Sequence, residues 1–333
     1  MISLAVKYRP KKFDEVVEQS ATKVILQQQL ESGNVKNAYL FCGGAGTGKT
    51  TCARIFANEI NKGQGSPVEL DAASNNSVDD VREIIAQSKT TSLDSEYKIF
   101  ILDEVHALSN SAWQAMLKVL EEPPKKSIFI MCTTDPQKIP KTILSRVQRY
   151  NFQRISQKAI AQRLEYVLMK EDAMREEDAY AIDYIAKQAN GGMRDALTML
   201  DKCLAYSGDL TIDNVVQALG MSDYATLTNF LCACIETDRT EQIELINQVY
   251  MSGKDLKQFI KDFTNFVVDC CKYNISGDKY ISCPNTEEII SVFRRVNEDE
   301  GTGLLSSLIK LQAEIKWDTN PLARVEAWCI TGE

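Results

Sequence analysis

The feature that most constrains this chain is a glycine-rich loop at residues 43–50, which reads G-G-A-G-T-G-K-T. This string matches the phosphate-binding pattern G-x-x-x-x-G-K-T. An apolar, aromatic run at residues 38–42 precedes it, and a helical pattern at 50–61 follows. A strand, loop and helix in this order bind phosphate, because loop N–H groups and the helix start surround the phosphate oxygens. The expected nucleotide contacts are Gly43, Gly44, Ala45, Gly46, Thr47, Gly48, Lys49, Thr50 and Thr51.

Strands and helices alternate along the first half of the chain, which predicts an α/β domain with a parallel sheet. The runs at 98–102 and 127–133 contain the uninterrupted apolar segments 99–102 and 128–132, as expected for strands that are buried on both faces. We expect strands at residues 38–42, 68–70, 98–102 and 127–133, and helices at 24–30, 50–61, 78–89 and 111–120.

From residue 156 onward only helical patterns occur, and a chain of 333 residues is expected to form more than one domain. We therefore predict an α/β nucleotide-binding domain at 1–155, a small helical lid domain at 156–221 and a helical third domain at 222–333. The expected helices are 159–169, 176–189, 193–206 and 212–219, followed by a helical stretch at 224–332 that is broken by a loop at 276–284.

A second set of chemical groups follows the apolar run at 98–102, which ends in Asp103 and Glu104. We expect Lys49 to reach the β- and γ-phosphates, and Thr50 with Asp103 to hold Mg²⁺. Glu104 would polarise the attacking water. Two carboxylates at a strand end can also simply face solvent, and their pairing with the phosphate loop favours the catalytic interpretation.

Two threonines and two arginines are further candidates. Thr133 and Thr134 follow the strand at 127–133, so either could contact the γ-phosphate, and either could instead cap the next turn. Arg146 and Arg194 could each reach a phosphate or form an ordinary surface ion pair. An arginine that stabilises the transferring phosphoryl group contributes about 10³ to 10⁵ in rate.

Composition narrows the function classes. The net charge of −8 argues against a surface that coats nucleic acid throughout, but allows a local basic channel. No apolar run approaches the ~20 residues of a membrane span, and residues 1–12 contain no apolar signal core, so a cytoplasmic protein is expected. The ten cysteines form no C-x-x-C pair and His106 is the only histidine, so we expect small buried thiols and no zinc.

Several strings together resemble one family, the gamma/tau subunits of bacterial DNA polymerase III, which are AAA+ proteins. The resemblance is dense from Lys7 to about Ala218 and weak afterwards. The strings L-E-E-P-P and T-T-D-P-Q-K are specific, since they are not general features of phosphate-binding loops. The matching segments are V-K-Y-R-P at 6–10, the loop at 43–50, D-A-A-S-N-N at 71–76, D-E-V-H at 103–106, L-E-E-P-P at 120–124, T-T-D-P-Q-K at 133–138 and L-S-R at 144–146.

This resemblance implies an ATP- and Mg²⁺-dependent subunit of a clamp loader, a five-subunit ring with delta-like and delta-prime-like partners. Such a ring opens the sliding clamp and places it on primer–template DNA, and the third domain would be its collar. Thr134 or Thr133 would be the first sensor and Arg194 the second, while Arg146 would reach a neighbouring subunit's γ-phosphate. The expected contacts on the adenine and ribose side are Tyr8, Arg9, Pro10 and Val17.

The resemblance also implies DNA contacts, and it has two departures. The positions that match the family's DNA contacts are Asn75, Asn76, Ser77 and Lys118.

The interval 61–69 is short and contains no cysteine, where the family usually carries a four-cysteine zinc module. The family's Ser-Arg-Cys reads Ser-Arg-Val at 145–147, which keeps the arginine. The family's extension after the collar, which binds helicase and polymerase, is expected to be missing.

Two other functions stay open at this point. One is another AAA+ motor of replication or recombination, such as a branch-migration helicase or an initiator, which DNA would stimulate without a clamp. The other is a ring-forming scaffold that binds nucleotide without hydrolysing it.

Overall fold

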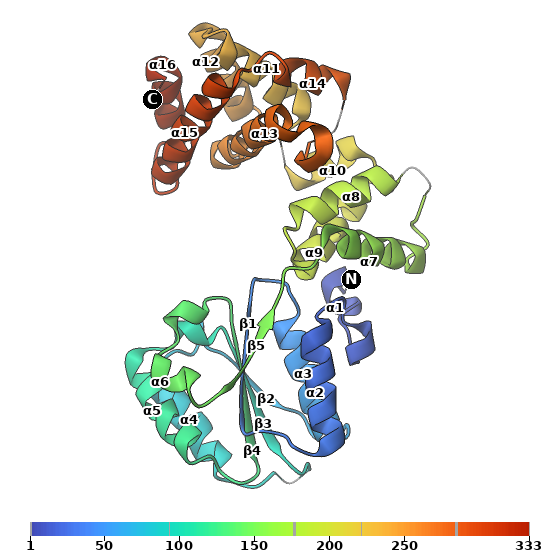
Figure 1. Ribbon diagram of the computed structural model, residues 1–333, viewed down its shortest axis with the longest axis vertical. Helices are drawn as coiled ribbons and strands as arrows, with labels where there is room; N and C mark the ends of the chain where they lie inside the picture. The colour runs from blue at the N-terminus through green and yellow to red at the C-terminus, as the bar shows by residue number, and fades with distance from the viewer. Residues whose placement is uncertain (1, 93, 176–177, 221, 284–285, 333) are drawn as a thin grey trace. The chain divides into compact units, whose positions relative to one another are not determined.

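The computed structural model describes residues 2–92, 94–175, 178–220, 222–283 and 286–332 (Figure 1). The chain forms two compact units, Met1–Gly208 and Asp209–Glu333. The predicted boundary at residue 221, the start of the predicted helix at 176–189 and the end of the predicted loop at 276–284 lie outside the described residues. The division into three domains therefore stays a prediction.

The first unit contains a five-stranded parallel sheet with strand order β2-β3-β4-β1-β5. The four strands expected from apolar runs are present. The fifth, β5, was not predicted, because its sequence Q-R-Y-N-F is mostly polar and only Tyr150 and Phe152 are buried. The strands are β1 Ala38–Gly43, β2 Val68–Asp71, β3 Lys98–Asp103, β4 Ser127–Thr133 and β5 Gln148–Phe152.

Helices cover both faces of this sheet (Figure 1). On one face α2 and α3 pack against side chains such as Tyr39 and Ile101, and on the other α4 and α5 pack against Leu40 and Leu102. Successive strand residues thus enter opposite cores, which explains the continuously apolar runs. These helices are α2 Ser20–Ser32, α3 Lys49–Ile60, α4 Val78–Ser88, α5 Asn110–Glu121 and the short α6 Lys141–Leu144, with 3₁₀ turns at Phe13–Glu15, Val105–Ala107 and Pro136–Lys138.

Three helices complete the first unit: α7 Gln157–Lys170, α8 Ala179–Gln188 and α9 Met193–Tyr206. They pack on one another, and the short N-terminal helix α1 Leu4–Lys7 packs on α9. The Leu4 N–H donates to Asp201 Oδ2 at 3.3 Å. The N-terminal segment is thereby attached to this helical group, although it precedes the sheet in sequence.

The second unit is helical throughout its described residues, as the patterns predicted. Its core is rich in phenylalanine, with Phe230, Phe259, Phe263 and Phe293 all buried. Across the described part of the chain, no helix combines the length and the apolar character that a bilayer crossing requires. The helices are α10 Ile212–Leu219, α11 Tyr224–Ile235, α12 Arg239–Met251, α13 Leu256–Ser276, α14 Glu287–Phe293, α15 Glu298–Ile315 and α16 Pro321–Thr331, with a 3₁₀ turn at Gly277–Tyr280.

Candidate nucleotide-binding site

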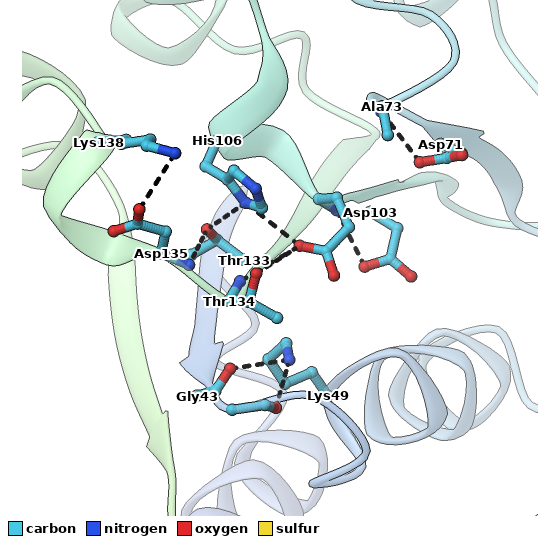
Figure 2. Close-up of polar contacts among 12 residues, drawn as sticks. Gly43, Lys49, Asp71, Ala73, Asp103, His106, Thr133, Thr134, Asp135 and Lys138 are labelled. Carbon is cyan, nitrogen blue, oxygen red and sulfur yellow. Dashed lines mark hydrogen bonds and ion pairs between the residues drawn. The ribbon is translucent and has the colours of Figure 1, made fainter. Parts of the chain in front are cut away.

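The glycine-rich loop connects β1 to α3, as its sequence predicted. Lys49 is buried, with 6% of its surface exposed, and its Nζ donates to the carbonyl oxygens of Gly43 at 2.9 Å and Gly44 at 2.8 Å (Figure 2). The Thr47 hydroxyl donates to the Gly44 carbonyl at 2.9 Å. The ammonium group is therefore held inside the loop, at the N-terminus of α3, where phosphate oxygens are bound in loops of this kind.

Two glycines of the loop are required by close neighbours. A Cβ atom at Gly43 would lie 2.4 Å from the Phe152 carbonyl oxygen on β5. Gly46 has φ +68°, and a Cβ there would lie 2.9 Å from the Cα of Gly192. Its carbonyl also accepts a hydrogen bond from the Met193 N–H at 3.0 Å. The loop thus contacts the first turn of α9 through backbone atoms.

Thr50 and Asp103 meet at the end of β3. The Thr50 hydroxyl donates to Asp103 Oδ2 at 2.7 Å, and the other Asp103 oxygen accepts from the Glu104 N–H at 3.0 Å. A hydroxyl and a carboxylate beside a phosphate loop are hard oxygen ligands of the kind that Mg²⁺ prefers. These two residues fit a magnesium ion bound together with a nucleotide.

Glu104 is held by its neighbours on one carboxylate oxygen. Its Oε2 accepts from the Thr134 hydroxyl at 3.0 Å and the Thr134 N–H at 3.3 Å, and lies 3.2 Å from His106 Nδ1. Its backbone is left-handed, with φ +48°, which turns the chain sharply after β3. The carboxylate is therefore positioned by residues from two segments, at the carboxyl end of the sheet where ligands bind in such folds.

The two threonines after β4 have different surroundings. Thr133 is fully buried, and its hydroxyl lies 3.2 Å from His106 Nδ1 and accepts from the Asp135 N–H at 3.0 Å (Figure 2). Its hydroxyl caps the following turn, which was one of the two roles expected. Thr134 instead contacts Glu104, so it is the threonine next to the candidate catalytic carboxylate.

A pocket of about 490 Å³ brings most of the predicted residues together. The predicted residues that line it are Tyr8, Arg9, Pro10, Val17, Ala45, Gly46, Thr47, Gly48, Lys49, Thr50, Thr51, Asp103, Glu104 and Arg194. Gly43, Gly44, Thr134 and Arg146 are predicted site residues that do not line it. The lining residues that the sequence did not indicate are Ala5, Val16, Arg54, Ile155, Arg163, Met193, Asp195 and Leu197.

The N-terminal wall of the pocket is held by α7 and the residue after it. Arg163 on α7 donates to the Tyr8 carbonyl at 3.2 Å, and the Tyr8 hydroxyl is hydrogen-bonded to Glu171. Desolvation, reinforced by Glu171, raises the pKa of Tyr8 to about 12, so its hydroxyl stays protonated. Desolvation also lowers the pKa of Arg9, and the nearby positive charges of Arg54 and Arg194 lower it further.

Gln19 is a connecting residue that the sequence did not single out. It is buried with φ +51°, and its amide pairs with both backbone groups of Gln153, at 2.7 and 3.0 Å. Its Nε2 also lies 3.5 Å from the Thr47 carbonyl oxygen. Gln19 thus joins the N-terminal segment, the phosphate loop and the link after β5. No phosphate-binding pattern includes it.

Arg146 lies away from the pocket of its own chain. Its Nη2 donates to Glu121 at 2.7 Å, and its Nη1 donates to the Thr142 carbonyl at 2.7 Å. Its side chain remains 33% exposed. Arg194 differs, because it lines the pocket from the first turn of α9.

The predicted DNA contacts lie at the start of α4 and on α5. Ser77 is the N-cap of α4, where its hydroxyl accepts from the Asp80 N–H at 3.2 Å. The Asn75 side chain donates to the Asp71 carbonyl at 3.1 Å, and the Asn76 carbonyl accepts from the Ser109 N–H. Lys118 is exposed on α5. DNA binding by these residues stays a prediction.

Among the residues that the structure describes, no group of three or more His, Cys, Asp or Glu side chains is arranged to hold a metal ion. Seven of the ten cysteines are buried. Desolvation raises the pKa of Cys52 to about 12 and of Cys203 to about 11, so these thiols stay protonated.

Comparison with known proteins gives the family. Residues 68–156 match the family model of the DNA polymerase III delta subunit, and residues 159–209 match that of the ATPase lid domain of a DNA polymerase III clamp loader subunit. The DNA polymerase III subunit gamma of Buchnera aphidicola is 31% identical over 79% of each chain. This chain belongs to the DNA polymerase III gamma/tau subunit family. The DNA polymerase III subunit tau of Bacillus subtilis is 35% identical to this chain over 94% of the chain. The matched region spans 60% of the length of that tau subunit.

Solved structures agree on the fold of this gamma/tau family member. The Holliday junction branch migration motor RuvB of Thermotoga maritima superposes with a TM-score of 0.53, at 20% identity, over 70% of this chain and 80% of that one. The parallel sheet with its helices, the lid helices and the helical second unit make this an AAA+ protein.

Proposed function

We propose that this protein is an ATP-hydrolysing motor subunit of a sliding-clamp loader. The observation that carries the proposal is one pocket that joins the phosphate loop, Asp103 and Glu104, the N-terminal segment and Arg194, in a chain of the gamma/tau family. A pocket built by the sheet domain and the lid helices together can couple the state of the nucleotide to the position of the lid.

The residues have separate roles in the proposed reaction. Lys49 binds the β- and γ-phosphates, and Thr50 with Asp103 holds Mg²⁺, which neutralises charge on the phosphates when it is bound. Glu104 orients and polarises the attacking water, and Thr134 fixes the Glu104 carboxylate through the contact at 3.0 Å. Arg194 contacts the phosphates from the lid. Arg146, outside its own chain's pocket, serves the γ-phosphate of a neighbouring subunit.

We infer the partners from the family and from the separation of these two arginines. An arginine that acts in a neighbour's site requires an adjacent subunit. The family supports a ring of five subunits with delta-like and delta-prime-like partners. The substrates of the ring are the sliding clamp and primer–template DNA, and its place is the cytoplasm, at the replication fork. Asn75, Asn76, Ser77 and Lys118 are the proposed contacts to DNA, and we propose that the protein needs no zinc.

The test is the rate of ATP hydrolysis by the protein assembled with its partner subunits. It is measured with the clamp, with primer–template DNA, with both, with neither, and with duplex or junction DNA in place of primer–template DNA. Stimulation that requires both supports the proposal. Stimulation by duplex or junction DNA alone would instead indicate a branch-migration or initiator motor. Turnover that is unaffected by Glu104→Gln would indicate a scaffold that binds nucleotide without catalytic hydrolysis.

A further inference from the structure

Arg54 lines the nucleotide pocket but has no role in the proposed reaction. It lies on α3, four residues after Thr50, so the two side chains share one face of the helix. We propose that Arg54 binds the α-phosphate of the nucleotide and that Glu69 is the residue that orients it. This inference rests on the proposed function, because it assumes that the pocket binds a nucleotide.

The guanidinium of Arg54 is fixed at one end. Its Nη2 pairs with Oε2 of Glu69 at 2.5 Å, and both side chains are partly exposed, at 40% and 37%. A partly exposed ion pair contributes little to stability, because water and ions screen it. Its larger effect here is on geometry, since Glu69 on the edge strand β2 restricts the directions in which the other N–H groups can point.

The other end of the guanidinium lacks a partner. The Nε atom of Arg54 is buried and makes no hydrogen bond with any residue that the structure describes. Buried donors are almost always paired, because losing hydration without gaining a bond costs free energy. An acceptor oxygen supplied by a ligand would satisfy this N–H.

Charge in the pocket favours an anionic acceptor. Burial lowers the pKa of Arg9, and the positive charges of Arg54 and then Arg194 lower it further, so both of these guanidinium groups lie near that of Arg9. The pocket is lined by five basic and three acidic side chains. Cations gathered in this way are stabilised when an anion binds between them.

The position of Arg54 along α3 indicates that the α-phosphate is the group it binds. Lys49 and Thr50 occupy the start of the helix, where the outer phosphates are expected, and Arg54 lies one turn further along. Its neighbour Arg9 is the residue expected on the adenine and ribose side. The α-phosphate connects these two parts of the nucleotide, so it is the anion that Arg54 can reach between them.

The experiment measures nucleotide affinity by calorimetry with the complete isolated chain, which requires neither clamp nor DNA. The ligands are ATP, 2′-deoxy-ATP, ADP and the two diastereomers of ATP with sulfur on the α-phosphate. We expect Arg54→Gln to weaken binding of the first three about tenfold and equally, because each carries the same α-phosphate. We also expect the wild type to prefer one sulfur diastereomer and Arg54→Gln to lose that preference.

Two further variants separate binding from structure. Arg82→Gln removes an arginine that pairs with Asp79 at 3.0 Å outside the pocket, so it should bind every ligand as the wild type does. Glu69→Gln should reduce the diastereomer preference, and combining it with Arg54→Gln should add little, because the two side chains act as one unit. A merely structural ion pair would change the melting temperature without changing this preference.

Three results would overturn the inference. The first is equal affinity of Arg54→Gln and the wild type for all ligands. The second is a loss confined to ATP and ADP with 2′-deoxy-ATP unaffected, which would assign Arg54 to the ribose hydroxyl. The third is an unchanged diastereomer preference. If the wild type binds none of these nucleotides, the proposed function itself fails, which is a distinguishable result.

Discussion

Lys49 and Arg146 are two cations in opposite surroundings, and they lead to opposite expectations. Lys49 is buried within the loop, whereas Arg146 is partly exposed outside the pocket. We expect Lys49→Ala to weaken ATP binding about 10- to 100-fold, because it removes charged hydrogen bonds to phosphate. We expect Arg146→Ala to bind ATP normally as an isolated chain. Titration calorimetry of both variants measures the difference.

The same arginine should matter for turnover in the assembled ring. With clamp and primer–template DNA present, we expect Arg146→Ala to lower stimulated hydrolysis about 10³-fold, because a charge that stabilises the transferring phosphoryl group is removed. Arg146→Lys is the control, since it keeps the charge without the forked geometry and should recover only part of the rate. Normal turnover by Arg146→Ala in the ring would rule out its role in a neighbour's site.

Gly46 allows a further prediction at this scale. Gly33 and Gly46 both have φ +68°, but only Gly46 has a close neighbour, Gly192. Either change to alanine should destabilise the protein by about 1 kcal/mol through backbone strain. Gly46→Ala should be more destabilising than Gly33→Ala, because its Cβ also collides with the backbone before α9. Urea unfolding of the two variants compares these free energies, and equal values would contradict a tight contact.

Individual site residues were predictable where a short motif carries the chemistry. The loop at 43–50 and the pair Asp103 and Glu104 could be located because phosphate and Mg²⁺ binding demand those residue types in that order. Gln19 and Arg163 could not be located from the sequence, because each pairs with a backbone group that is distant in sequence. The partner of Gln19 is Gln153, and the partner of Arg163 is Tyr8. The sequence likewise did not reveal that the Thr133 hydroxyl caps a turn while Thr134 contacts Glu104.

At the scale of elements, the sequence predicted strands by their burial. β1, β3 and β4 are central and apolar, so their patterns are clear. β5 is an edge strand whose neighbour covers only one side, and its alternation is confined to Tyr150 and Phe152. Such short polar strands are specified by pairing with a distant partner, here β1, which local sequence does not reveal.

Helix α4 gives a prediction about an element boundary. Ser77 forms a capping box with Asp80, in which each side chain accepts from the other residue's N–H. We expect Ser77→Ala to lower the free energy of unfolding by about 1 kcal/mol, and Ser77→Thr to restore most of it. Chemical denaturation measures this. If Ser77→Ala is as stable as the wild type, the hydroxyl does not cap the helix.

At the scale of the molecule, the candidate nucleotide pocket is lined by residues of one unit. Every residue that lines the pocket lies within Met1–Gly208. We therefore expect a fragment of residues 1–208 to fold and to bind ATP within about threefold of the complete chain, since compact units of this kind can fold alone. Calorimetry of the fragment tests this, with Lys49→Ala in the same fragment as the control. A folded fragment that does not bind ATP would mean that residues 209–333 contribute to the site.

The ion pair between Arg146 and Glu121 has a consequence for how subunits would communicate under the proposed function. A neighbour's γ-phosphate that binds Nη2 of this guanidinium would compete with the Glu121 carboxylate, which accepts from Nη2 at 2.7 Å. The free energy gained when Arg146 binds the phosphate is then the difference between two ionic contacts. This contact would therefore stabilise subunit association only weakly. Next to a neighbour that lacks a γ-phosphate, Arg146 would remain paired with Glu121. Glu121 would then be an internal competitor, and its ion pair would raise the attraction that a neighbour's nucleotide needs to bind Arg146.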